Sequence, residues 1–301
     1  MTEPIKGHLA MLAFSMLVAG SFALGSIVAN EIEPTALNAV RFLISLLVIG
    51  VAAWATGGIP RSTWVAPWRY LVLGGLFAVY FVLMFEGLKS APPVSAAAVF
   101  TLTPVLSAFV GWVLLRQITT PRMAVALSLG AMGAVWVIFR ADLSAVLAFA
   151  VGKGELIYFV GVICHAIYTP MVRKLNRGER PLVFSFGTIC AGLVVLLVWG
   201  WPAIWATDWT ALSPIVWVTI LYVAICASSM TFVLLQFASL RLPAAKVMAY
   251  TYLTPSWVIL WEISLGNGAP QAIVLAGVVL TIVALGLLLK VEDKVSTAQE
   301  A

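Results

Sequence analysis

Side chains able to bind a small molecule recur every three or four residues in the apolar run 243–265. Lys246, Tyr250, Thr254 and Trp257 share one face of a helix at this spacing, and Trp261 continues it. Aromatic rings can stack on an apolar ligand and an ammonium group can bind a carboxylate, although such rings are often core or lipid-facing bulk. Because a lysine lies on the same stripe, the pattern favours a cavity over bulk packing.

A second stripe lies in the apolar run 153–172, where Tyr158, His165 and Tyr168 face one way. His165 is about twelve residues into the run, near the middle of a membrane, where an ionisable group is a candidate for function. It could accept a proton or contact the ligand, or it could only hydrogen-bond a neighbouring helix. Both interpretations stay open.

Asn38 and Arg41 share a face of the run 35–56, with Arg41 ~10 Å inside the membrane. Arg41 could bind a carboxylate with two hydrogen bonds, or it could cap a neighbouring helix end, and the second role is slightly favoured. Other polar candidates facing inward are Tyr80, Ser95, Thr101, Thr103, Tyr222 and Ser229.

Candidates for proton coupling are His165, Glu86 and Glu262. Glu86 precedes Lys89 by three residues, so a local ion pair is the favoured interpretation there. The sequence has no His-Glu-x-x-His motif, no paired intramembrane aspartates and no nucleophile elbow. Its three cysteines lack metal-site spacing. We therefore expect no enzyme, no metal and no cofactor.

The elements that position these residues must be membrane helices. Of the 301 residues, 62% are hydrophobic and 10% charged, and the mean hydropathy is +1.07, far from the values of a soluble domain. Unbroken runs of about 20 apolar residues predict helices rather than a β-barrel. The first run resembles a signal peptide but is long enough to span. The ten predicted spans are 9–29, 35–56, 67–87, 92–115, 121–139, 153–172, 181–200, 213–237, 243–265 and 270–289.

The stretch 85–104 reappears at 236–255, with Leu102-Thr103-Pro104 matching Leu253-Thr254-Pro255. A proline inside a helix removes a backbone donor, and broken helices at matching positions of two halves indicate a transporter binding site. Pro104 and Pro255 are therefore predicted helix breaks. Five helices per half make the duplication inverted. We expect a first repeat at 1–140, an external linker at 141–152, a second repeat at 153–290 and a cytoplasmic tail at 291–301.

Basic residues are concentrated on one side of the predicted membrane. If the amino terminus is inside, the outer loops hold only Lys89, Arg140 and Lys153, and nearly all other Lys and Arg lie inside. Such an asymmetry sets orientation, so both termini are expected in the cytoplasm, and the charge of +5 needs no nucleic-acid partner.

Ten helices in two inverted halves, each with a fourth helix broken at Leu-Thr-Pro, resemble the EamA-type branch of the drug/metabolite transporter superfamily over about residues 7–290. More narrowly, the chain is similar to aromatic amino acid exporters of bacterial inner membranes. The resemblance implies that eight helices surround a central cavity, with the fifth helix of each half outside. Related sequences often have Gly-Glu after helices 4 and 9, where this chain has Leu115-Arg116 and Gly266-Asn267.

We therefore expect a monomeric secondary transporter that exports amino acids, aromatic and other apolar or neutral ones, by alternating access across a bacterial inner membrane. The main alternative is an exporter of drugs or other small metabolites. A nucleotide-sugar carrier would need more buried basic groups than Arg41 and Lys246. A channel lacks a filter-like repeat, and without a phosphate-binding loop the driving force must be a gradient.

Overall fold

The protein is a bundle of helices in a computed structural model that describes residues 3–147 and 151–289, and this part contains no strand. The predicted tail 291–301 and residues 148–150 of the predicted linker lie outside it. The helices of the first half are α1 (Glu3–Val28), α2 (Pro34–Ala55), the 3₁₀ turn η1 (Arg61–Trp64), α3 (Trp68–Leu88), α4 (Pro93–Phe100), α5 (Thr103–Leu115) and α6 (Pro121–Ile138).

The second half begins with a short helix inside the predicted linker. Its elements are α7 (Leu143–Leu147), α8 (Lys153–Leu175), α9 (Pro181–Ala206), α10 (Pro214–Ala224), the π-helical η2 (Ile225–Met230), α11 (Thr231–Ser239), α12 (Ala244–Ala249), the 3₁₀ turn η3 (Tyr250–Leu253), α13 (Thr254–Ser264) and α14 (Ala272–Leu289).

Nine helical spans of the described residues are long and apolar enough to cross a membrane, with α4 and α5 counted together as Pro93–Leu115 and α10 to α11 as Pro214–Ser239. The tenth predicted span, 243–265, is divided among α12, η3 and α13, so it does not count as one continuous helix. Five helices, α2, α4, α6, α9 and α10, begin at a proline, whose fixed φ suits the first turn and whose missing donor is not needed there.

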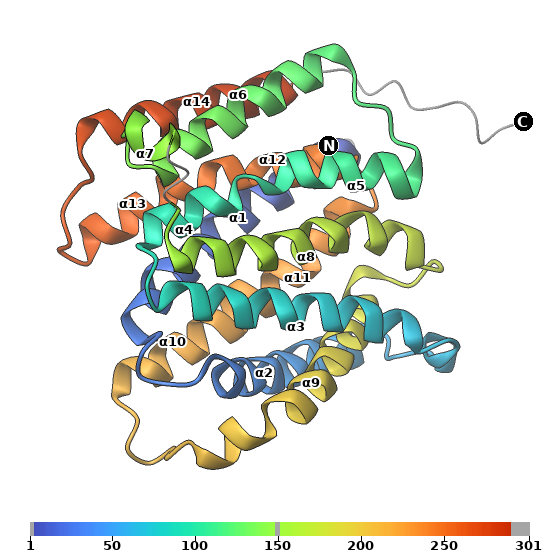
Figure 1. Ribbon diagram of the computed structural model, residues 1–301. Coiled ribbons are helices and arrows are strands. Elements are labelled where there is room, and N and C mark those ends of the chain that lie inside the picture. The colour runs from blue at the N-terminus through green and yellow to red at the C-terminus, as the bar shows by residue number, and fades with distance from the viewer. Residues whose placement is uncertain (1–2, 148–150, 290–301) are drawn as a thin grey trace, which may run out of the picture.

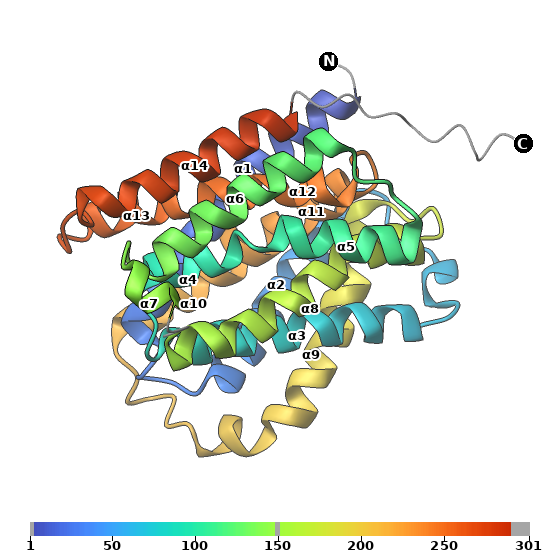
Figure 2. The ribbon, with the colours of Figure 1, turned by 45° about the horizontal axis from the view of Figure 1, so that its top comes forward.

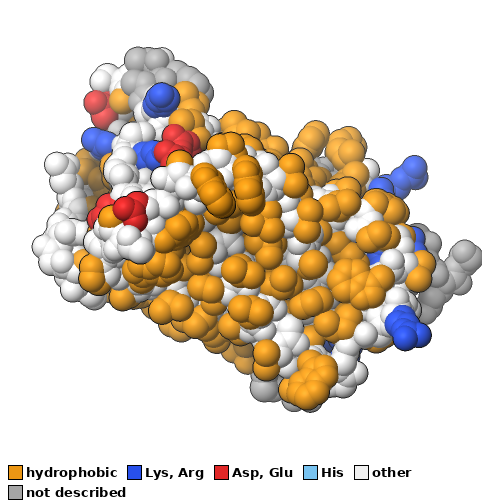
Figure 3. Space-filling view, turned by 90° about the horizontal axis from the view of Figure 1, so that it is seen from below, with side chains coloured by type: hydrophobic (Ala, Val, Ile, Leu, Met, Phe, Trp, Pro, Cys, Tyr) orange, Lys and Arg blue, Asp and Glu red, His pale blue; other side chains and the backbone are white. Residues whose placement is uncertain are grey.

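The helices lie roughly parallel or antiparallel to one another, with α6 and α14 side by side on one flank and α2 and α9 together on the opposite flank (Figures 1 and 2). We call the end with the loops 56–67, 116–120, 176–180 and 240–243 the inner end, at the right of Figure 1, and the opposite end the outer end. The face in Figure 3 is broadly apolar between two charged ends, as expected for a surface that contacts lipid.

Glycines let the helices approach closely where the halves meet. A Cβ on Gly74 of α3 would lie 2.4 Å from the backbone nitrogen of Gly192 of α9. Gly133 of α6 and Gly277 of α14 each meet the other's carbonyl oxygen, at 2.6 and 2.7 Å from the Cβ positions. Small residues are what membrane helices use to pack without a hydrophobic driving force.

Candidate functional site

Aromatic rings from both halves meet in a central cluster, which we define as Phe77, Tyr80, Tyr158, His165 and Tyr168. The His165 ring lies 5.2 Å from Phe77 and 4.6 Å from Tyr80, and Phe77 lies 3.8 Å from Tyr168, as distances between ring centroids. All five side chains are buried. The structure therefore brings four of the predicted site residues together, between α3 and α8.

The side chains in and beside the central cluster also carry polar groups, namely tyrosine hydroxyls, an imidazole and an amide. The hydroxyls of Tyr80 and Tyr158 are 3.2 Å apart, and Gln236 Nε2 of α11 donates to the Tyr168 hydroxyl at 2.7 Å. His165 Nδ1 and Gln236 Oε1 are buried without a hydrogen-bond partner among the described residues. Since an unpaired buried polar atom is costly, a ligand that hydrogen-bonds both would be stabilised here: Gln236 Oε1 accepts, and His165 Nδ1 accepts in the tautomer protonated at Nε2.

Arg41 lies beside the central cluster and is fully buried. Its Nε donates to Ser228 Oγ at 2.6 Å, an Nη donates to the Ala227 carbonyl at 2.9 Å, and the guanidinium lies 3.6 Å from the centre of the Phe81 ring. Ser228 and Ala227 belong to η2, a π-helical turn of the kind often found at functional sites. These contacts favour the helix-capping interpretation of Arg41. Asn38 lies next to it, its Oδ1 3.4 Å from an Nη.

The π-helical turn changes the register that we predicted for the run 213–237. Tyr222 and Ser229 were expected on one inward face, but η2 inserts a wider turn between them. Ser229 Oγ donates to the Ala224 carbonyl within the turn, while the Tyr222 hydroxyl donates to Leu17 of α1. The two side chains thus have different hydrogen-bond partners, and their shared inward face stays a prediction.

Both predicted helix breaks coincide with the ends of helices. In the first half α4 ends at Phe100 and α5 begins at Thr103, so Pro104 is the second residue of α5. The Phe100 carbonyl accepts from Thr103 Oγ1 at 2.5 Å, and Thr101 Oγ1 donates to Ala98. Both threonines are thus used within the broken helix.

In the second half the turn η3 separates α12 from α13, and Pro255 is again the second residue of the following helix. The Thr251 carbonyl accepts from the backbone nitrogen of Thr254. Thr254 Oγ1 is buried with no partner among the described residues, unlike its counterpart Thr103. The two breaks are therefore not equivalent chemically.

Other predicted site residues have contacts away from the central cluster. Ser95 Oγ donates to Glu155 Oε1 at 2.8 Å near the outer end, and Trp257 Nε1 donates to Ser15 Oγ at 3.3 Å. The Tyr250 ring faces His8 of α1, and Lys246 is buried on α12. The 243–265 stripe thus turns toward α1 at Tyr250 and Trp257.

The carboxylates proposed for proton coupling differ in their surroundings. Glu86 forms the local ion pair with Lys89, at 2.8 Å. Glu262 accepts from Asn267 at one oxygen, and its other oxygen is buried without a partner among the described residues. Sequence reasoning missed Glu155, whose buried carboxylate is held by Ser95. No group of three potential metal ligands occurs in residues 3–147 and 151–289.

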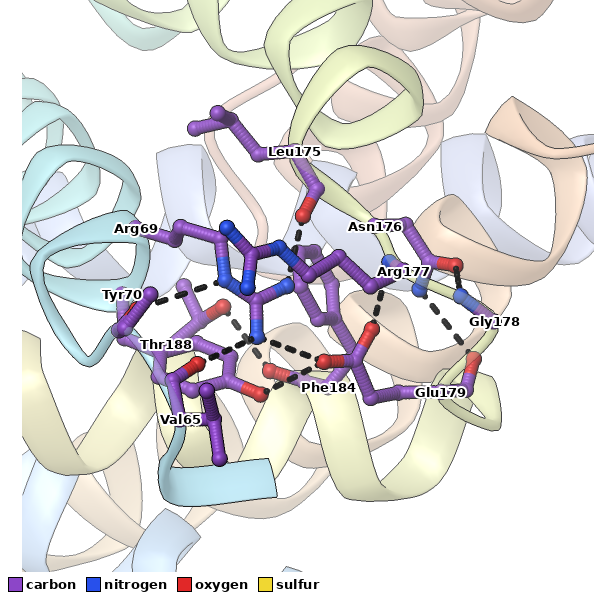
Figure 4. Close-up of polar contacts among 11 residues, drawn as sticks. Val65, Arg69, Tyr70, Leu175, Asn176, Arg177, Gly178, Glu179, Phe184 and Thr188 are labelled. Atoms are coloured by element: carbon purple, nitrogen blue, oxygen red, sulfur yellow. Dashed lines mark hydrogen bonds and ion pairs between the residues drawn. The ribbon is translucent and has the colours of Figure 1, made fainter. Parts of the chain in front are cut away.

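The sequence also gave no sign of the buried network at the inner end. Arg69 falls at the start of the predicted span 67–87 and was given no role, but it is the second residue of α3, 1% exposed, and pairs with Glu179 at 2.6 Å (Figure 4). Burial opposes ionisation of Glu179, but hydrogen bonds from Arg69 and the Arg177 backbone outweigh it and lower the pKa of the carboxyl. The only sequence signal is that Glu179 is the single acidic residue of the loops 56–67, 116–120, 176–180 and 240–243.

Two cavities near the outer end contain open space. One of 590 Å³ lies between the α1–α2 and α9–α10 loops, lined by Glu31, Glu33, Lys89 and Asp208 among others. One of 240 Å³ lies between α4, α6 and α14 and includes Ser95. Neither is lined by the central cluster, whose rings fill the space between α3 and α8.

The profile of the EamA-like transporter family matches residues 5–139 and again residues 152–290. The chain belongs to the EamA-like transporter family. It is 26% identical over 269 residues to the uncharacterized transporter YyaM of Bacillus subtilis (strain 168), covering 87% of this chain and 86% of that one. It is 24% identical over 282 residues to an uncharacterized transporter of Archaeoglobus fulgidus, covering 92% and 95%.

This EamA-like transporter also shares its fold with a solved crystal structure. The TM-score is 0.72 at 21% identity, over 95% of this chain and 96% of the other. The family and the apolar helices together identify a multi-pass membrane protein.

Proposed function

We propose that this EamA-like transporter exports amino acids from the cytoplasm by alternating access, with aromatic and other apolar or neutral amino acids preferred. The observation that carries the proposal is the central cluster, a buried set of rings with His165 Nδ1 and Gln236 Oε1 unpaired beside them. Rings stack on an apolar side chain, and the two acceptors suit an ammonium group.

The substrate carboxylate needs donors, and the broken helices supply them in this proposal. The backbone groups at the start of a half-helix carry a partial positive charge that favours an anion. Buried Thr254, with its free Oγ1 at the start of α13, is suited to that role, and buried Lys246 lies two turns before it. Arg41 stabilises the π-helical turn beside the site.

The architecture in this proposal is ten crossings in two inverted repeats around the central cluster. Support comes from equivalent packing in the two halves: α3 packs on α8, and its counterpart α10–α11 packs on α1, the counterpart of α8. The double match of the family profile agrees with a duplication. Because the central cluster is closed in this conformation, access requires movement of helices, as alternating access does.

Export of other small metabolites or drugs is the second candidate. A lipophilic cation needs a carboxylate within the membrane, and the unpaired oxygen of Glu262 is the observation that favours it. We place the protein in a bacterial inner membrane as a monomer, as the resemblance to bacterial exporters implies. Both termini lie in the cytoplasm in this proposal, because the basic residues gather at the inner end.

Transport in proteoliposomes tests the proposal. Labelled phenylalanine, leucine and threonine should cross, and a panel of unlabelled amino acids should compete in order of ring and apolar size. Cells that express the protein should resist toxic amino acid analogues and gain no resistance to cationic dyes. Failure of all three amino acids to move in either direction would exclude this substrate class.

A further inference from the structure

A buried ion pair closes the inner end between α3 and α8. Arg69 donates to Glu179 Oε1 at 2.6 Å and to the carbonyl of Leu175, the last residue of α8, at 2.6 Å (Figure 4). Glu179 is held in turn by the backbone nitrogen of Arg177, at 2.6 Å from Oε2, and by the Tyr70 hydroxyl at 3.4 Å. One guanidinium thus joins the start of α3 in the first half to the α8–α9 loop in the second.

This pair lies at the inner end of the two helices that hold the central cluster. Arg69 is eight residues before Phe77 on α3, ~12 Å along the helix, and Leu175 is seven residues after Tyr168 on α8. The central cluster lies between these same two helices. A solute that enters between α3 and α8 from the inner side must therefore part Arg69 from Glu179 and Leu175.

The outer end has a contact at the corresponding position of the other repeat. Glu179 follows the first long helix of the second half, and Glu31 follows the first helix of the first half. Glu31 accepts a hydrogen bond from Ser213, at the start of α10, just as Glu179 accepts from the start of α3.

The two contacts differ in strength. The inner one is a charged pair with side-chain exposures of 1% and 11%, whereas Glu31 is exposed, bonds a neutral hydroxyl, and borders the 590 Å³ cavity. The Glu31 carboxylate also makes a charge-assisted hydrogen bond, but it has no counter-charge in Ser213, and exposure to water weakens the contact further.

We propose that Arg69 and Glu179 form a latch that holds the inner end shut between α3 and α8. The latch rests on the alternating access of the proposed function. Opening it exposes both charges to water, which solvates them, so the latch slows opening without making it impossible.

Removing one charge should release the latch while the fold is kept. Glu179→Gln preserves the shape of the side chain and an acceptor oxygen, but leaves Arg69 without its counter-charge. Arg69→Gln removes the donors to Leu175 as well. Arg241→Gln is the matched control, since Arg241 also joins the halves at the inner end, to Glu3 at 2.7 Å, but with exposures of 26% and 55%.

The test is alkylation of a single cysteine placed between the latch and the central cluster. Val172 is buried on α8 between Tyr168 and Leu175. In a background with Cys164, Cys190 and Cys226 changed to Ala, Val172→Cys is treated with a membrane-impermeant maleimide in inside-out and in right-side-out vesicles. We expect Glu179→Gln and Arg69→Gln to raise the labelling rate from the inner face at least tenfold, and Arg241→Gln to change it less than twofold.

Labelling of Glu179→Gln at the parent rate overturns the latch, as does a rise from both faces together, which marks a general loosening. An equal rise in Arg241→Gln overturns it too, because any inner contact would then serve. No substrate enters this assay. A protein that moves no amino acid can therefore still show the latch, and an active exporter can still lack it.

Discussion

Arg41→Lys separates the two interpretations of the buried arginine. Lysine keeps the positive charge, so the cost of burying a charge largely cancels between variant and parent. It loses the planar fork with which Arg41 reaches Ser228 and Ala227 at once, at 2.6 and 2.9 Å. The substitution therefore weakens the clamp on the π-helical turn without removing the charge beside the central cluster.

The size of the loss follows from these contacts. A hydrogen bond from a charged donor contributes about 1.5–3 kcal/mol, and a desolvated contact of a cation with a ring about 2 kcal/mol. One ammonium can replace one of the two short hydrogen bonds and part of the contact with Phe81. We expect Arg41→Lys to lower the free energy of unfolding by about 2–3 kcal/mol, and Ser45→Ala, which removes a neutral donor to the Ala224 carbonyl, by about 1 kcal/mol.

Reversible unfolding in mixed detergent and dodecyl sulfate micelles, followed by tryptophan fluorescence, measures this loss. Transport by the folded fraction should keep a KM for phenylalanine within about threefold of the parent. The contacts that the substitution removes stabilise the π-helical turn and do not bind the substrate. An unchanged unfolding free energy together with a tenfold higher KM would show that Arg41 binds the substrate carboxylate directly, and our reasoning would be refuted.

Three further outcomes are expected. Gly74→Ala places a methyl group 2.4 Å from the backbone of α9 and should cost about 1–3 kcal/mol of unfolding free energy, whereas Gly75→Ala, with open space around its Cβ, should cost nothing in the same assay. The pKa of Glu179 is lower in the folded protein than in the unfolded chain, so its ion pair with Arg69 stabilises the fold fully above about pH 4.5. This stabilisation is lost as the pH falls through the lowered pKa. A pH titration of thermal stability should show the loss in the parent and not in Glu179→Gln. His165→Ala should lower phenylalanine transport at least threefold or abolish its pH dependence, and unchanged transport at every pH would remove His165 from the site.

The membrane class, the helices and most of their ends could be predicted because they depend on local physics. The predicted spans 121–139 and 153–172 correspond to α6 and α8 within a few residues. Apolar length and the prolines at helix starts are properties of short stretches, readable without any partner. The same local physics placed Tyr158, His165 and Tyr168 on one stripe of α8.

The pairings across the bundle could not be predicted, because they join residues far apart in sequence. Arg69 and Glu179 are 110 residues apart, and in the sequence Arg69 is one more basic residue near the inner end of a predicted span. The wider turn at η2 is equally hidden, since no residue type marks it. The contacts of Tyr222 and Trp257 with α1 are also long-range and could not be predicted.

The reciprocal contact of Gly133 and Gly277 limits where this protein can bend. With no side chain between the two backbones, α6 and α14 have no room to slide closer and lose their packing if they part. They are best regarded as a fixed pivot on one flank of the molecule. The helices farther from that pivot are then the ones expected to move during transport. A crosslink between α6 and α14 should therefore leave transport intact.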